Sequence, residues 1–96
     1  MKIVVFEPNK RGYIKEIPNT LEAMQEVVGG KIEVVHLTTD VIAVCNEEGR
    51  ILGLPNNRCG LVGTFFCCGE DGEDFTSLSE GTKQRLISFM GGIGGD

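Results

Sequence analysis

The sequence predicts an α+β fold in which a single, mostly antiparallel sheet carries one helix packed across a face and a second helix at the C-terminal end. Two observations predict it. A capped amphipathic segment at residues 19–28 lies between extended segments, and short apolar or alternating runs separated by turn residues fill most of the rest. The expected order is β-β-α-β-β-β-β-α. We assign residues 1–90 to one domain and expect residues 91–96 to be a flexible glycine-rich tail.

The first two strands are expected to pair as a hairpin. Residues 2–6 are a continuous apolar run, which is typical of a strand covered on both faces. Residues 7–12 contain Pro, Asn and Gly and predict a turn. Residues 13–17 alternate and would pair back on the first strand, and their mixed faces favour an edge position.

The central helix has clear start and stop signals. Pro18 restricts Ile17 to an extended conformation, and Asn19 is a favoured N-cap residue. Glu22 complements the positive helix end, and the two glycines at residues 29–30 stop the helix. Apolar residues recur between them at helical spacing: Leu21, Met24, Val27 and Val28. A helix of about ten residues is marginal alone, so this stripe must be buried on the sheet.

The remaining strands and the last helix follow from similar patterns. Strands are expected at residues 31–37, 41–45, 50–54 and 61–68. Gly63 would mark a bulge or a close backbone approach in the last of them. Ser79 is expected to cap a helix that runs to about residue 90. Its apolar stripe comprises Leu86, Ile87, Phe89 and Met90.

Composition and charge exclude several classes of protein. The net charge of −5 disfavours a nucleic-acid-binding surface, which needs a basic face. No stretch approaches the roughly 20 apolar residues of a membrane span, and the N-terminus lacks the pattern of a signal peptide. We therefore expect a cytoplasmic protein without direct nucleic-acid or membrane binding.

The cysteines do not predict a metal site. Cys67 and Cys68 are adjacent, so they would point to opposite faces of a strand, and no pair of CxxC motifs is present. We expect reduced thiols, with Cys45 and one of the vicinal pair in the core. His36, the only imidazole, lies in a strand pattern, which disfavours Cys/His catalysis. No cofactor, metal or catalytic residue is expected.

One candidate binding site is the polar loop that precedes the last strand. It comprises Pro55, Asn56, Asn57 and Arg58, together with Thr64. Arg58 offers a planar donor fork for phosphate or carboxylate, and Asn57 an amide that both donates and accepts. The alternative, which we favour, is structural: Asn57 caps the turn and Arg58 pairs with an acidic loop such as residues 70–74.

A second candidate is the acidic stretch of Glu70, Asp71, Glu73 and Asp74. It is too short for an EF-hand loop, which needs twelve residues. A solvated turn is the default interpretation. If the stretch has a function, a basic patch on a partner protein is the expected target, because complementary charge improves encounter rate and specificity.

Three segments of the chain resemble a known family. They are MKIVVFEPNKRGYIKEIPNTLEAMQEVVGGKIEVV, VCNEEGRILGLPNNR and GTFFCCGEDGEDFTSLSE, in this order. They are similar to a family of small domains of unknown function from phages, plasmids and other mobile elements, chiefly of Gram-positive bacteria. The family pattern LPxNR matches Leu54, Pro55, Asn57 and Arg58, and residues 58–62 resemble a shortened form of a longer family loop.

The resemblance implies a context, because small accessory proteins of mobile elements often inhibit host defence. We predict a non-enzymatic binding protein that inhibits a host defence effector, for example a CRISPR effector, through its acidic loops in the host cytoplasm. One alternative is a nucleotide-signal sponge that uses Asn57 and Arg58, with a homodimer seam as one location for the site. Another is a structural or regulatory role within a phage programme.

Overall fold

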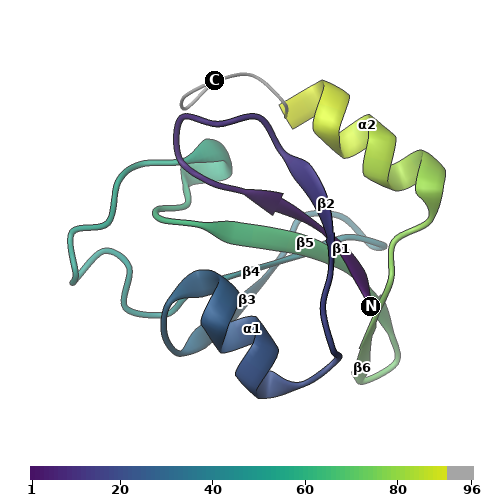
Figure 1. Cartoon of the computed structure of the whole chain (residues 1–96), viewed down its shortest axis with the longest axis horizontal. Helices are drawn as coiled ribbons and strands as arrows, with labels where there is room; N and C mark the ends of the chain where they lie inside the picture. Colours follow the sequence, from purple (N-terminus) through teal and green to yellow (C-terminus); the bar gives the residue numbers. More distant parts are fainter. Residues whose placement is uncertain (91–96) are drawn as a thin grey trace.

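The computed structural model describes residues 1–90, which form one antiparallel sheet with a helix on each face (Figure 1). The strands are β1 (Lys2–Phe6), β2 (Tyr13–Glu16), β3 (Ile32–His36), β4 (Ile42–Asn46), β5 (Phe65–Asp71) and β6 (Asp74–Thr76). The helices are α1 (Leu21–Val28), the short 3-10 turn η1 (Arg58–Gly60) and α2 (Glu80–Met90). The strands lie in the order β2-β1-β5-β4-β3, and β6 pairs with the end of β5. The expected α+β class and the order of strands and helices are confirmed.

The core lies on both faces of the sheet. Ile3 and Val5 of β1 pack under α1, whereas Val4 and Phe6 pack on the opposite face, towards α2. This two-sided burial explains the continuous apolar run of β1. The rest of the sheet follows the same rule, because α1 lies against β3, β4 and β5, and α2 lies against β1.

Helix α1 begins one residue later than expected. Thr20, rather than Asn19, is the N-cap, and its hydroxyl accepts a hydrogen bond from the backbone N–H of Ala23 at 3.2 Å. The side-chain amide of Asn19 instead donates to the backbone oxygen of Phe75 at 2.9 Å. This contact with a distant segment keeps Asn19 from capping the helix. At the other end, Gly29 ends the helix with φ of 80°, as expected.

Two strand predictions need correction. No strand forms at residues 50–54, because this segment belongs to a closed turn in which Leu52 N–H donates to the oxygen of Glu48 at 2.9 Å. The strand expected at residues 61–68 begins only at Phe65, since Gly63 adopts φ of 73° and interrupts the extended chain. Apolar content alone does not make a strand where no neighbouring strand is available for pairing.

The C-terminal part of the domain departs from expectation in one place. Residues 70–74 are not a plain turn: Glu70 and Asp71 end β5, Asp74 begins β6, and the two strands form a hairpin. Ser79 caps α2 as expected, since its hydroxyl accepts from Thr82 N–H at 3.2 Å. Leu86 and Ile87 pack against the core as predicted. The expected positions of the Phe89 and Met90 side chains and of the tail at residues 91–96 lie outside the described residues.

No helix within residues 1–90 is long and apolar enough to cross a membrane.

Candidate functional site

The candidate loop, residues 54–64, is held in place by the side chain of Asn57. This side chain is buried, and its amide nitrogen donates to the backbone oxygens of Phe6 at 2.9 Å and Gly63 at 2.8 Å. Its amide oxygen accepts from the backbone N–H of Arg58 at 2.8 Å and from the guanidinium of Arg58 at 3.0 Å. An asparagine amide has two donor hydrogens and two acceptor sites. All four are used within the protein, so Asn57 has none left for a ligand.

The guanidinium of Arg58 is also committed to the interior. Arg58 is 1% exposed and lies over the ring of Phe6 at 5.2 Å from its centroid. It donates to the backbone oxygens of Lys10 and, at 3.5 Å, of Glu7. These carbonyls of the turn after β1, rather than the acidic stretch at residues 70–74, lie against the guanidinium. The structure therefore places the donor fork inside the domain, away from the surface where a phosphate would bind.

The other residues of this candidate site do not all meet in one cleft. Asn56 is exposed and forms an isolated bridge with Val62. Thr64 is half-buried and, with Pro55, lines a shallow cavity of about 350 Å³ beside α1. A Cβ atom on Gly63 would lie 2.6 Å from the Leu54 side chain, so this glycine makes room for a neighbour and not for a ligand.

The acidic candidate is exposed and lies on a paired hairpin. The β5–β6 hairpin pairs Asp71 with Asp74, and Glu73 lies in the turn between the two strands. Glu70 forms an ion pair with His36 at 3.0 Å when the imidazole is protonated. Within residues 1–90 no ion pair engages Asp71, Glu73 or Asp74. The hairpin thus presents three uncompensated carboxylates on a hydrogen-bonded scaffold.

Three of the thiols belong to the core. Burial raises the pKa of Cys67 and of Cys68 to about 12, with smaller contributions from neighbouring negative groups. Burial, and then the carboxylate of Glu33, raises the pKa of Cys45. Both vicinal cysteines are buried, where only one was expected, because the sheet is covered on both faces. Cys59 is the exposed thiol, in a left-handed backbone conformation with φ of 59°.

We expect brief treatment of the folded protein with iodoacetamide at pH 8 to give a single adduct, on Cys59. The other thiols are buried, and the raised pKa values keep the thiolate scarce. Mass spectrometry measures the number of adducts. Treatment in denaturant should modify all four cysteines, and Cys59→Ser should leave the folded protein unmodified. A second adduct forming as fast as the first would contradict this arrangement.

Metal chemistry has no evident site in the described part of the chain. Within residues 1–90, no group of three or more His, Cys, Asp or Glu side chains lies close enough together to hold a metal ion.

The fold and these surfaces define a small α+β domain with a core on both faces of its sheet. Its polar loop is held by internal hydrogen bonds, and one group of its exposed carboxylates lies on the β5–β6 hairpin. Residues 1–90 match the model of a protein family described as a domain of unknown function, DUF3846, and the chain belongs to this family. No curated protein and no solved structure matches the chain. The resemblance to a family of small domains of unknown function is confirmed to that extent.

Sequence reasoning missed two surface features. Ile51 is 85% exposed and Leu52 is 60% exposed, on the closed turn that follows β4. Their apolar character alone predicts a strand. The flanking Asn-Glu-Glu-Gly and Gly-Leu-Pro segments, in contrast, indicate a turn. The second feature is the outer edge of β3, which only the order of strands in the sheet reveals.

Proposed function

We propose that this domain is a non-enzymatic protein whose role is to bind another protein. The observation that carries the proposal is the β5–β6 hairpin, which holds Asp71, Glu73 and Asp74 exposed on a paired backbone. Because the backbone of the hairpin is already paired, these carboxylates reach a partner without the entropic cost of ordering a flexible loop. They also steer a partner with a basic surface and increase its association rate.

The proposed partner is a host protein, and more narrowly an effector of a host defence system. The resemblance of the chain to small proteins of phages, plasmids and other mobile elements supports this choice. Defence effectors that act on nucleic acid, CRISPR effectors among them, need basic surfaces to bind it. An acidic hairpin complements such a surface and would compete there with the nucleic acid.

The geometry gives less support to a nucleotide bound at the Asn57–Arg58 loop. A phosphate could reach the guanidinium of Arg58 only if it displaced the carbonyls of Glu7 and Lys10. Each hydrogen bond to a charged group contributes roughly 1.5–3 kcal/mol. The amide of Asn57 has no unused donor or acceptor, so each contact with a nucleotide would replace one of its four bonds. Binding at this loop would therefore begin by breaking the network that closes it.

The experiment is affinity capture from a bacterial host lysate with three forms of the protein. Replacing Glu73 and Asp74 with Lys should abolish enrichment of a specific host protein that the wild type captures. The matched control also replaces two carboxylates with Lys, at Glu16 and Glu26. Both are exposed and lie away from the hairpin, so this variant should retain the partner.

With the purified partner, the hairpin variant should associate at least about tenfold more slowly at low salt, and the difference should shrink as salt screens the charges. Equal association rates for the wild type and the hairpin variant would rule out this mode of binding.

A further inference from the structure

The outer edge of β3 is open. Strand β3 lies at one end of the sheet and pairs with β4 on its inner side. Glu47 N–H donates to the oxygen of Lys31, and Leu37 N–H to the oxygen of Val41. Backbone groups alternate in direction along an antiparallel strand, so the odd-numbered residues 31–37 face β4. The N–H and C=O groups of residues 32, 34 and 36 therefore point outward, and no other strand within residues 1–90 pairs with them.

The opposite edge, β2, also exposes apolar side chains, at Tyr13 and Ile14, but it carries adjacent charges and a nearby proline. All four residues of β2 are exposed, Lys15 and Glu16 place charge on both of its faces, and Pro18 follows closely. Such charges and prolines hinder the addition of a further strand. In β3 the central residues, Val34 and Val35, are uncharged and only half-buried. Added apolar side chains could pack on them.

A small cavity lies beside the open edge, on the α2 face of β3. It has a volume of about 190 Å³. Its apolar lining comes from Cys45, Ile51, Leu61 and Val62, and its polar lining from Glu33, Asn46, Glu47, Arg50 and the backbone of Gly60. In strand addition, main-chain hydrogen bonds supply affinity and pockets for alternate side chains supply specificity. The apolar part of this cavity is suited to a single apolar side chain of an added strand, and the polar part to the hydrophilic groups beside it. The exposed Ile51 would be covered by the same contact.

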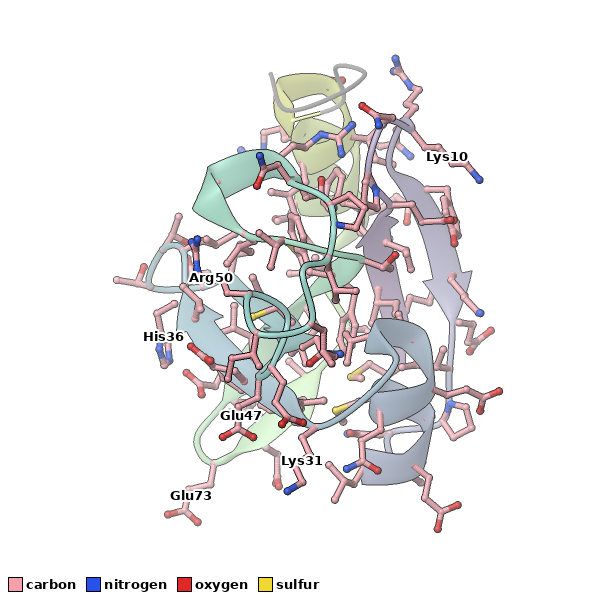
Figure 2. The ribbon with its side chains drawn as sticks, turned by 90° about the vertical axis from the view of Figure 1, so that its left-hand side faces the viewer. Lys10, Lys31, His36, Glu47, Arg50 and Glu73 are labelled. Carbon is pink, nitrogen blue, oxygen red and sulfur yellow. The ribbon has the colours of Figure 1, made fainter. Side chains whose placement is uncertain are left out.

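The charge around the edge indicates the sign of the charge that the added strand carries. Glu33 lies on β3 itself, Glu47 and Glu48 follow β4, and no ion pair within residues 1–90 engages any of them. Figure 2 shows Glu47 and Glu73 on the same side of the molecule as His36. Two cations lie nearby: Lys31 at the start of the strand, and Arg50, which lines the cavity and donates to the backbone oxygen of Gly60 at 2.7 Å. The three carboxylates outnumber these two cations, so the surroundings of the edge are negative on balance and complement a basic segment.

We propose that β3 accepts an extended, basic segment of a partner protein as an additional strand, with one apolar side chain of that segment in the cavity beside Cys45. The proposal rests on the proposed protein-binding function and specifies where and how the partner docks. The hairpin would attract the partner, and the β3 edge would hold it through main-chain hydrogen bonds.

The first test uses a capped ten-residue peptide of alternating Lys and Val, with a Glu and Val peptide as its control. Amide hydrogen exchange of the full-length protein is followed by NMR. The basic peptide should slow exchange of the N–H groups of Ile32, Val34 and His36 at least tenfold, and the acidic peptide should not. Protection that is absent, that is equal for both peptides, or that falls on Ile14 and Glu16 of β2 would overturn the proposal.

The second test uses proline at matched positions of the two edges. Val34→Pro removes an outward N–H and no bond to β4. Ile14→Pro likewise removes an outward N–H, on β2. Ile17 N–H donates to the oxygen of Met1, so the backbone groups of the odd-numbered residues of β2 face β1 and those of Ile14 point outward. Val34→Pro should weaken peptide binding at least tenfold, and Ile14→Pro should not. Equal binding by both variants would overturn the proposal.

A charge variant covers the case in which Val34→Pro does not fold. Replacing Glu33 and Glu47 with Lys leaves the backbone unchanged and should weaken binding of the basic peptide by a similar factor. Unchanged binding would count against the proposal.

If the hairpin variant loses the host partner while Val34→Pro retains it, the proposed function stands and strand addition at β3 fails. A dimer in native mass spectrometry that Val34→Pro dissociates would also overturn it, since a second copy would then occupy the edge.

Discussion

Replacing Arg58 with alanine should lower the free energy of unfolding by at least about 3 kcal/mol. Truncation removes the charged donor from the partly buried backbone oxygens of Glu7 and Lys10 and removes the cation over the Phe6 ring. It also opens a cavity where a large, fully buried side chain was. In a domain of this size, such a loss lowers the melting temperature by roughly 12 °C or more, which differential scanning calorimetry measures.

Two further variants distinguish the geometry of Arg58 from its charge. Arg58→Lys keeps the charge but has no planar fork, so it cannot donate to the carbonyls and to Asn57 together, and we expect about 2 kcal/mol of destabilisation. Arg50→Ala is the matched control. Arg50 is exposed and makes one hydrogen bond, to the oxygen of Gly60 at 2.7 Å, so its loss should cost less than about 1 kcal/mol. Similar stabilities for Arg58→Ala and Arg50→Ala would refute the structural role of Arg58.

Asn57→Ala should cost about 2–4 kcal/mol, the second largest effect that we expect from a single substitution outside the apolar core. The substitution removes the acceptor for Arg58 and the donor for the backbone oxygens of Phe6 and Gly63. These groups are buried, so water cannot readily replace the lost partner. Chemical denaturation with urea measures the change.

The neighbouring asparagine provides the control. Asn56 is exposed, and Asn56→Ala should change the free energy of unfolding by less than about 0.5 kcal/mol. Because Asn57 and Arg58 share a hydrogen bond, the double variant should be destabilised by less than the sum of the single variants. Additive losses, or equal losses for Asn56→Ala and Asn57→Ala, would show that the network does not close the loop.

These two side chains give a physical reason for the LPxNR pattern. Asn57 ties the loop to the end of β1 through Phe6, and Arg58 ties it to the turn that follows β1 through Glu7 and Lys10. Leu54 fills the space that Gly63 leaves. The pattern therefore stabilises the connection between β4 and β5.

The structure agrees with a structural role for Asn57 and Arg58, but it does not pair Arg58 with residues 70–74. A structural role for Asn57 and Arg58 was the favoured alternative, but the acidic stretch was the expected partner of the arginine. Besides the side chain of Asn57, the acceptors of Arg58 in the described part of the chain include backbone oxygens about 50 positions earlier. Every residue has a carbonyl oxygen, so no residue type in the sequence marks those at Glu7 and Lys10 as the acceptors.

The sequence alone determined the α+β class, the helix that ends at Gly29, and the core strands β1 and β4, because hydrophobic period and capping chemistry are local properties. Only the tertiary structure decided that Thr20 replaces Asn19 as the cap, that residues 50–54 turn instead of pairing, and that β3 lies at the edge of the sheet. Each of these outcomes depends on which distant segment supplies a hydrogen-bond partner. A local sequence pattern does not predict that partner, because the two segments come together only when the whole chain folds.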